Sequence, residues 1–364
     1  MMILFPVLAY NRDIYYLFKI SGAMIMKAAV FCGKSKIKVM EVEKPQPALD
    51  EVVIQVKACG VCGTDMHIYE GSEGAAKTVP PIILGHEFSG IISETGKDAK
   101  SVKVGDRVCV DPNDMCGKCY YCRIGRKHFC ENMIGIGTTI NGGFAQYCKV
   151  SEKQVYKISD GISFEEAAMG EPVSCCLHGI DLAGVKAGDT VMIIGGGAIG
   201  QIMLQLAKIS GASTIILIEP VKWKRELGYK LGADIAIDPI GENVEDKLRE
   251  LEIEHIDVAI ECVGLKNTME DAIKYVSRGG TVMMFGLTDP ECTIPLKPFD
   301  IFKREITIKA SYINPYTMKR ALSLIESRKI NVKDIITDKV DIDDINDVFE
   351  RGMYKGRGKI IVKP

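Results

Sequence analysis

Apolar residues follow two different patterns along the chain. Between residues 26 and 178, short runs such as KAAVF, EVVIQVKACG and FAQYCKV are separated by Gly and Pro. Runs of this length, rich in Val, Ile and aromatic residues and bounded by turn residues, are typical of strands. We therefore predict a compact, mainly β domain over residues 26–178.

Beyond residue 178, apolar runs alternate with helical stretches. Strands are predicted at residues 190–195, 214–219, 235–238, 256–264, 281–286 and 306–312, and the helices between them end near residues 210, 231, 251 and 277. Apolar strands that alternate with helices indicate βαβ units and a parallel sheet covered on both faces. We predict this α/β domain over residues 179–312. Residues 313–364 add a helix at 317–328, an acidic stretch and a last strand, KIIVKP.

The first 25 residues fit neither pattern. Two apolar runs are interrupted by Asn11, Arg12 and Asp13, and neither run is long enough to span a bilayer. No basic region precedes them, as a secretory signal would require. We interpret residues 1–25 as an N-terminal extension of unclear role, either an upstream addition or a misplaced start, and we expect no membrane anchor.

Composition and charge narrow the function classes. The chain has 364 residues, 47% of them hydrophobic, which suffices for two domains with buried cores. Its net charge of −2 lacks the basic footprint of a nucleic-acid-binding protein, so we expect no nucleic-acid partner. The thirteen cysteines are an odd number in a chain with no visible secretory signal. We therefore expect a cytoplasmic location and no disulfide framework.

Four of these cysteines form one cluster in the sequence CGKCYYCRIGRKHFC. The spacing is Cys116-x2-Cys119-x2-Cys122-x7-Cys130. Four thiolates in one loop-rich stretch can surround one Zn²⁺ tetrahedrally, and a Cys₄ site with no open position is structural. Unrelated thiols or disulfides are the weaker interpretation, because clustered cysteines in a cytosolic chain indicate a metal. We predict a structural zinc lobe at about residues 111–131.

A second metal constellation is more dispersed. Cys62, in CGVCGTDMH, and His86, in LGHEF, offer a thiolate and an imidazole, which suit Zn²⁺. A catalytic zinc needs about three protein ligands and an open position. The candidate third ligands are Glu87, which follows His86, and Glu171, in the apolar-flanked sequence GEPV. The residues alone do not decide between them.

Further polar residues lie close to Cys62 in the sequence. Asp65 could hold a ligating imidazole from behind the metal, and Thr64 and His67 could carry a proton from the metal-bound oxygen to water. His67 could also be an ordinary surface histidine. We expect no ligand role for the three remaining histidines, His128, His178 and His255.

A glycine-rich motif opens the second domain. Gly195-Gly-Gly197-Ala198-Ile199-Gly200 follows the apolar run TVMII and precedes a helical stretch. In a strand-turn-helix context this motif binds dinucleotides, with the pyrophosphate at the helix N-terminus. The first glycine permits the tight turn, the second lets the backbone approach the pyrophosphate, and the third allows close packing of helix and strand.

The end of the next strand predicts which dinucleotide binds. Glu219 stands 19 residues after Gly200. A carboxylate there accepts the hydroxyls of the adenosine ribose and repels a 2′-phosphate, so NAD is favoured over NADP. Lys222, Lys224 and Arg225 follow closely and keep NADP as the alternative, with Arg225 as a further cofactor-binding candidate.

Together these motifs resemble the zinc-dependent medium-chain dehydrogenase/reductase family. The resemblance covers about residues 26–364, and its motifs stand in the family's order. It is strongest to the polyol (sorbitol, xylitol, arabinitol and butanediol) dehydrogenases and extends to the L-threonine dehydrogenases. It implies a GroES-like β domain with a Rossmann domain beside it, a cleft between them, and a C-terminal segment that returns to the first domain.

The resemblance also implies roles for individual residues. Cys62, rather than Cys59, matches the ligand of the catalytic zinc, and His86 matches the histidine ligand. Polyol members use the glutamate that matches Glu87, and carry a Glu-Pro like Glu171-Pro172 that reaches zinc directly or through water. The family's proton relay matches Thr64 and His67. Zinc would then activate a substrate hydroxyl whose hydride passes to NAD.

Departures from the family's subgroups limit the substrate. Liver-type alcohol dehydrogenases carry a cysteine in place of Glu171, which disfavours simple primary alcohols. Threonine dehydrogenases usually carry a histidine shortly before the structural cysteines, where this chain reads DPNDMCG. Tyr312, Asn314 and Tyr316 match the family's cleft lining and differ from the sorbitol enzymes' arginine-containing pattern.

We therefore expect an NAD-dependent zinc dehydrogenase for a secondary alcohol in a polyol or diol. The expected cofactors are NAD and two zinc ions per chain, one catalytic and one structural. An L-threonine 3-dehydrogenase is the alternative, and a non-catalytic NAD(H)-binding zinc protein is the alternative from another class. Since relatives are often tetramers, we expect a homo-oligomer, with a tetramer as the first expectation.

Overall fold

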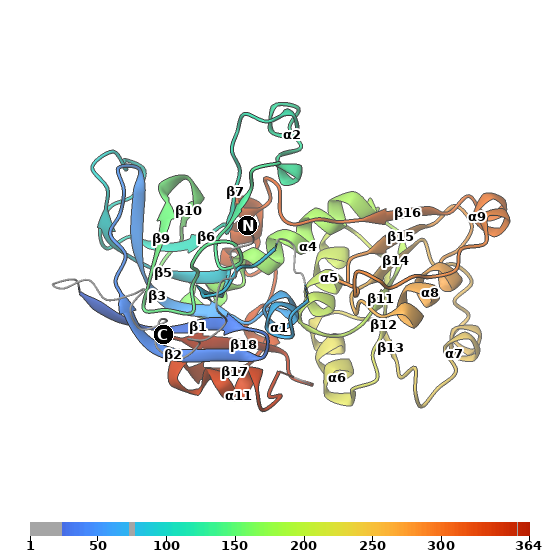
Figure 1. The fold of residues 1–364 in the computed structure, drawn as a ribbon. Coiled ribbons are helices and arrows are strands. Elements are labelled where there is room, and N and C mark those ends of the chain that lie inside the picture. Colours follow the sequence, from blue (N-terminus) through green and yellow to red (C-terminus); the bar gives the residue numbers. More distant parts are fainter. Residues whose placement is uncertain (1–23, 73–76, 355) are drawn as a thin grey trace, which may run out of the picture.

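A strand-rich body and a helix-covered parallel sheet lie side by side in the computed structural model (Figure 1). The structure describes residues 24–72, 77–354 and 356–364. Most of the predicted extension at 1–25 therefore lies outside the described residues. Ile25, at its end, already belongs to the first strand and pairs with Glu43.

The strand-rich body contains two main sheets. The smaller has the order β2-β1-β4, and the larger has the order β10-β6-β5-β3-β18-β17, with β9 also paired to β3. The strands are β1 (Ile25–Gly33), β2 (Lys36–Glu43), β3 (Glu51–Gly60), β4 (Ile82–Ile83), β5 (Glu87–Thr95), β6 (Arg107–Val110), β9 (Tyr147–Ser151), β10 (Val155–Lys157), β17 (Ile336–Asp341) and β18 (Lys359–Lys363). The C-terminal strand β18 pairs antiparallel with β3, so the last residues belong to the first body.

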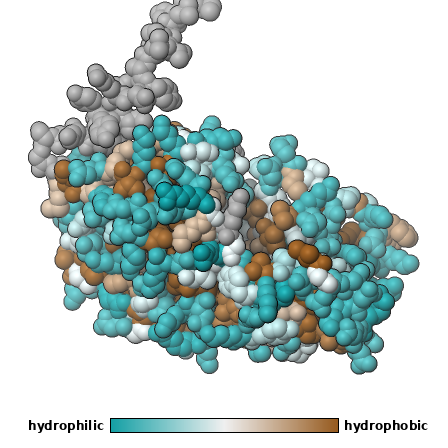
Figure 2. Space-filling model, turned by 90° about the horizontal axis from the view of Figure 1, so that it is seen from below, coloured by the Kyte–Doolittle hydropathy of each residue, from teal (hydrophilic) through white to brown (hydrophobic). Residues whose placement is uncertain are grey.

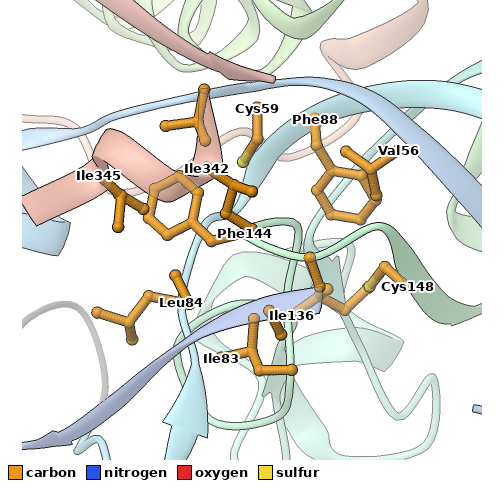
Figure 3. Packing of buried hydrophobic residues seen from close by; sticks show 14 of the residues in the cluster. Val56, Cys59, Ile83, Leu84, Phe88, Ile136, Phe144, Cys148, Ile342 and Ile345 are labelled. Atoms are coloured by element: carbon orange, nitrogen blue, oxygen red, sulfur yellow. The ribbon is translucent and has the colours of Figure 1, made fainter. Parts of the chain in front are cut away.

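The core of this body joins distant parts of the chain. Figure 3 shows Val56 of β3 and Phe88 of β5 with Phe144, and Ile342 and Ile345 of the C-terminal segment packed beside them. All five side chains are buried. Burying one such side chain stabilises the fold by about 1.5–3 kcal/mol relative to leaving it exposed. The short helices of this body are α1 (Gly63–Tyr69), α3 (Phe164–Ala168) and α11 (Ile345–Phe349), with 3₁₀ turns η3 (Glu152–Gln154), η4 (Lys333–Ile335) and η5 (Ile342–Asp344).

A separate lobe projects from the strand-rich body. It holds α2 (Tyr120–Arg123), which Figure 1 shows at its tip, and the 3₁₀ turn η2 (Lys127–Phe129). A two-stranded sheet, β7 (Asn113–Asp114) with β8 (Ile134–Gly135), forms its base. This lobe carries the four clustered cysteines.

The second body is a six-stranded parallel sheet with the order β13-β12-β11-β14-β15-β16. Its strands are β11 (Thr190–Ile194), β12 (Thr214–Ile218), β13 (Ile235–Ile237), β14 (Val258–Glu261), β15 (Thr281–Met284) and β16 (Thr307–Ala310), and its helices are α5 (Ala198–Ile209), α6 (Lys222–Leu231), α7 (Val244–Glu250), α8 (Lys266–Tyr275) and α9 (Pro298–Arg304). The strand order reverses between β11 and β14, and ligands of doubly wound sheets bind at such a switch point. The predicted α/β class, with a mainly β domain and a parallel-sheet domain, is confirmed.

Two helices connect the bodies. The helix α4 (Gly170–Ala183) runs from the strand-rich body to the parallel sheet and packs against α5 and against α10 (Met318–Glu326). The boundary expected at residue 178 therefore falls inside a helix. The sequence pattern did not indicate this helix. Most residues of α4 are buried, so the helix lacks the alternation of apolar and polar faces that marks a surface helix.

The surface offers no membrane-spanning element within the described ranges, where no helix is both long and apolar enough to cross a bilayer. Figure 2 shows a mostly hydrophilic face with hydrophobic residues in separate patches.

Candidate active site

A cleft of ≈ 370 Å³ lies between the two bodies. Its lining comes from the strand-rich body, from the carboxyl ends of the parallel strands and from the C-terminal segment. It brings together Cys62, His86 and Glu171 with Ile199 of the glycine motif. A cavity of ≈ 430 Å³ on the strand-rich body, near Tyr147, holds no metal-ligating cluster among the described residues.

Three candidate metal ligands meet at one wall of this cleft. One ligand atom each from Cys62, His86 and Glu87 lies within 4.8 Å of the others. Cys62 is the N-cap of α1, Glu87 is the first residue of β5, and His86 immediately precedes this strand. The turn before them needs Gly85, at φ +91°, where a Cβ would lie 2.8 Å from Cys59 Sγ. Sulfur, nitrogen and oxygen donors at this separation suit Zn²⁺.

Asp65 supports two of these groups from the interior. Its side chain is fully buried, and its Oδ2 accepts a hydrogen bond from the backbone N–H of Cys62 at 2.9 Å. Its Oδ1 lies 3.4 Å from Nδ1 of His86. Burial alone would lower the pKa of His86, but Asp65 and Cys62 outweigh it and raise that pKa well above its usual value. A carboxylate behind Nδ1 leaves Nε2 free for a metal, as predicted for Asp65.

Glu87 is already paired within the chain. The Nζ of Lys359 lies 2.7 Å from Oε1 and 2.6 Å from Oε2 of Glu87, and it also donates to the carbonyl of Val61. Both side chains are at most 5% exposed. Burial would lower the pKa of Lys359, but Glu87 outweighs it and raises that pKa. The carboxylate of Glu87 is thus neutralised beside the metal ligands by a lysine that the sequence did not single out.

Glu171 reaches the same cleft from α4. It is buried in the first turn of this helix, and its Oε1 accepts a hydrogen bond from the thiol of Cys175 at 3.2 Å. Burial raises the pKa of Glu171 to about 7. Its carboxylate lies outside the group of atoms within 4.8 Å of one another. The structure therefore places Glu171 in the cleft but not within that cluster.

Thr64 and His67 also line the cleft, one helical turn apart on α1. His67 is partly exposed, so a proton could pass from the cleft to solvent along this face of the helix. Thr64 and His67 thus both line the cleft, and their proton-carrying role stays a prediction.

The four lobe cysteines converge as predicted. The Sγ atoms of Cys116, Cys119, Cys122 and Cys130 lie within 4.8 Å of one another. Backbone N–H groups of Lys118 and Cys119 lower the pKa of Cys116 to about 6. Burial raises the pKa of Cys122 to about 12, so this thiol would be deprotonated by metal binding rather than beforehand. Four converging sulfurs, which no other His, Cys, Asp or Glu joins among the described residues, fit a structural zinc.

The glycine motif forms the expected turn from β11 into α5. Gly195 has φ +98°, and a Cβ on Gly200 would lie 1.7 Å from the carbonyl oxygen of Gly195. α5 begins at Ala198, which points its free N–H groups toward the turn. Such a helix N-terminus binds phosphate groups.

Glu219 faces this turn. It follows β12 and is 5% exposed, and its Oε2 accepts a hydrogen bond from the N–H of Gly196 at 2.7 Å. Its Oε1 accepts one from Val221 at 2.8 Å. The carboxylate thus lies beside the glycine motif, where a ribose would meet it.

The guanidinium of Arg225 is already engaged by other residues of the chain. Its guanidinium donates to the carbonyl oxygens of Glu219 and Pro220 and lies 3.1 Å from the carboxylate of Asp238. These contacts hold Arg225 against the end of β12. They leave it poorly placed to be the cofactor ligand that the sequence indicated.

The expected cleft lining at residues 312–316 is wrong in part. Tyr312 lines the cleft, but Asn314 is buried and bonds to Asn113 and Ser174. Tyr316 is 61% exposed on another face, with Lys127 over its ring. Tyr316 also adopts φ +60°, a backbone conformation that is uncommon for a tyrosine.

Other residues lining the cleft were missed. Tyr354 and Cys175 both line it, from the C-terminal segment and from α4. The capping box of Ser163 and Glu166 could have revealed the helical region before Cys175, since it marks the start of α3. No sequence signal marks Tyr354. Of the three histidines without an expected role, none belongs to a metal-ligating group in the described part of the chain.

Comparisons with known proteins support this description. The family model for the alcohol dehydrogenase GroES-like domain matches residues 48–160, and that for zinc-binding dehydrogenases matches residues 198–327. D-arabinitol dehydrogenase 1 of Uromyces fabae is 35% identical, over 93% of this chain and 97% of its own. L-threonine 3-dehydrogenase of Caldanaerobacter subterraneus is 36% identical, over 91% of this chain and 96% of its own.

A solved structure agrees over nearly the whole chain. A zinc-binding dehydrogenase from Sinorhizobium meliloti 1021, crystallised with NADP, superposes with a TM-score of 0.90 at 37% identity. The match covers 94% of this chain and all of that one. With the two family models and the long relatives, this confirms the GroES-like and Rossmann-type domains and the polyol dehydrogenase-like resemblance. The chain is an oxidoreductase that belongs to the zinc-dependent medium-chain dehydrogenase/reductase family.

Proposed function

We propose that the chain transfers hydride between a secondary alcohol of a polyol or diol and NAD, with zinc as the catalytic metal. The observation that carries this proposal is that the metal ligands Cys62 and His86 and the dinucleotide motif open onto one cleft. A hydroxyl at the metal and a nicotinamide from the motif would meet there. The relatives named as alcohol and arabinitol dehydrogenases support the reaction class.

The chain's own residues would position the reactants and move the proton. Bound zinc supplies a Lewis acid that acidifies the substrate hydroxyl, and bound NAD supplies the hydride acceptor. Cys62 and His86 would hold the metal, and Asp65 would fix the ring of His86. Thr64 would accept the hydroxyl proton while its own hydroxyl proton moves on to His67, and the imidazole would release a proton to solvent.

We propose that Glu171 is the third metal ligand beside Cys62 and His86, and that its carboxylate reaches the metal directly or through water. The ion pair with Lys359 supports this choice, since it engages both oxygens of Glu87. Drawing Glu87 to the metal would leave Lys359 buried without a partner, which is costly. Within the described residues, no ion pair links Glu171 to a lysine or arginine, and the Cys175 thiol engages only its Oε1.

The cleft lining favours a neutral, hydroxylated substrate. Its polar members include Asn113, Thr138 and Ser311, and no Lys or Arg lies among the described lining residues. An L-threonine carboxylate would therefore enter without a cationic partner, close to the carboxylate of Glu171. The L-threonine 3-dehydrogenases among the relatives keep threonine as the second candidate substrate.

A substrate panel tests this proposal. With NAD, we expect kcat/KM for at least one of D-arabinitol, xylitol, sorbitol and 2,3-butanediol to exceed that for ethanol and L-threonine by about 10-fold, or about 1.4 kcal/mol. Neighbouring hydroxyls can use the polar lining that ethanol leaves unpaired. Initial rates of NADH formation give the comparison. If L-threonine exceeds every polyol and diol, the enzyme is a threonine dehydrogenase and the polyol proposal is wrong.

Glu219 is expected to set the preference for NAD over NADP. In Glu219→Ala, the ratio of kcat/KM for NAD to that for NADP should fall by about 10-fold, because a ribose acceptor and a repulsive charge are both lost. The NADP-bound relative makes this comparison necessary. Glu226→Ala is the control, since its side chain is 64% exposed on α6. An unchanged ratio in Glu219→Ala would mean that another residue reads the ribose.

A non-catalytic NAD(H)-binding protein is the remaining alternative. The donor atoms of Cys62, His86 and Glu87 lie together at the cleft, which Glu171 also lines, and this argues against a scaffold, which needs only the Cys₄ lobe.

The homo-oligomer also remains a proposal. Phe299 and Phe302 of α9, both more than 70% exposed, lie beside the edge strand β16 and would suit a subunit contact. The cytoplasmic location stays a prediction.

A further inference from the structure

Glu261 is a buried acidic residue that the proposed reaction does not use. It ends β14 and is fully buried. Its Oε1 accepts three hydrogen bonds, from the N–H of Val263 at 2.7 Å, the N–H of Gly264 at 2.9 Å and the hydroxyl of Thr268 at 2.7 Å. Its Oε2 is buried and has no hydrogen-bond partner. A buried carboxylate oxygen without a hydrogen-bond partner destabilises the fold. Its presence here therefore suggests a functional role for Glu261.

The backbone of the same residue holds a second loop. The carbonyl oxygen of Glu261 accepts hydrogen bonds from the N–H of Phe285 at 3.0 Å and from that of Gly286 at 2.9 Å. Glu261 therefore joins residues 262–264, which follow β14, to residues 285–287, which follow β15.

The two loops pack very closely over the carboxylate. A Cβ on Gly286 would lie 2.3 Å from the N of Gly264 and 2.6 Å from Oε2 of Glu261. A Cβ on Gly264 would lie 2.2 Å from the carbonyl oxygen of Leu287. Since neither position has room for a side chain, the relative position of the loops depends on backbone contacts and on the Glu261 carboxylate.

Both loops form the wall of the cleft that faces the metal ligands. Cys262, Val263, Phe285, Gly286 and Leu287 all line it. The strand order of the sheet places β14 and β15 on one side of β11, and β12, with Glu219, on the other. A dinucleotide whose adenosine end lies at Glu219 crosses the glycine motif and brings its other end to the loops after β14 and β15.

We propose that Glu261 is a positioning residue for the nicotinamide end of the cofactor. Its backbone carbonyl holds residues 285–287, and its carboxylate holds the loop after β14 against them through Val263 and Gly264. The carboxylate thereby sets the surface on which the nicotinamide lies, without touching the cofactor itself. This inference rests on the proposed function, because it assumes that a nicotinamide dinucleotide binds in this cleft.

The test compares two probes that share the adenosine end. NADH carries the nicotinamide, and ADP-ribose lacks it. In Glu261→Ala, we expect the Kd of NADH to rise about 10-fold, while the Kd of ADP-ribose changes by less than about 2-fold. Loss of a merely structural residue would weaken both probes alike. Calorimetric titration of the purified, zinc-loaded protein measures both constants under the same conditions.

Two further variants keep the test independent of the stability of Glu261→Ala. Glu261→Gln retains an acceptor oxygen of the same shape and should restore most of the NADH affinity. Thr268→Val removes one donor to Oε1 and should raise the NADH Kd by about 3-fold, with ADP-ribose again unaffected. Glu254→Ala is the charge control, since its side chain is 84% exposed in the same domain.

The outcomes separate this inference from the function on which it rests. Equal loss of both probes in Glu261→Ala, or an unchanged NADH Kd, would overturn the positioning role while leaving the dehydrogenase proposal intact. Failure of the parent protein to bind NADH would overturn the proposed function and this inference with it.

Discussion

Replacement of Cys62 by serine or of His86 by alanine is expected to lower kcat/KM by on the order of 10³-fold while NADH still binds. Both side chains belong to the group of donor atoms within 4.8 Å of one another. Losing either should empty the metal site and remove the Lewis acid, which contributes several kcal/mol, and about 4 kcal/mol corresponds to this factor. The glycine motif that would hold NADH lies on the other body and is untouched.

Three measurements on each variant check this prediction: turnover, NADH affinity and zinc content. Zinc should fall from two to one ion per chain, because the Cys₄ lobe keeps its own. Cys59→Ser is the matched control. Cys59 stands in the same sequence motif, but its thiol is buried beside the carbonyl oxygen of Gly60 and lies outside the ligand group. Near-normal turnover in Cys62→Ser or His86→Ala would remove these residues from the metal site.

Local patterns in the sequence predicted a large part of this molecule. The glycine motif, the cysteine spacing and the alternation of strands and helices each depend on residues close together in the chain. α5, α6, α7, α8 and α10 accordingly end within about two residues of the predicted positions. The resemblance to the dehydrogenase family also rested on such motifs, and the comparisons confirm it.

The features that the sequence did not predict depend on contacts between distant residues. Lys359 and Glu87 are 272 residues apart, and only the pairing of β18 with β3 brings them together. α4 was not predicted because most of its residues are buried, so it lacks the broad polar face of a surface helix. Tyr316 is not part of the cleft lining, and its positive φ, which a tyrosine rarely adopts, is indicated by no sequence pattern.

The Lys359–Glu87 pair leads to the second large expected effect, on stability. Lys359→Met should lower the free energy of unfolding by about 3–5 kcal/mol, because the carboxylate of Glu87 would be left buried without its counter-charge. Methionine replaces the aliphatic part of the lysine, so lost packing contributes little. The lysine also donates to the carbonyl of Val61, which precedes Cys62. Urea unfolding followed by circular dichroism measures the loss.

A double variant separates the lost charge pair from other consequences of the substitution. In Lys359→Met with Glu87→Gln, no unpaired charge remains, and more than half of the lost stability should return, since neutral replacement of a buried ion pair is often tolerated. Lys319→Met, at an exposed position on α10, controls for the chemistry of the change. If the single and double variants are equally destabilised, the carboxylate of Glu87 does not depend on Lys359. Glu87 would then be available to the metal, and the assignment of Glu171 as the third metal ligand would lose its main support.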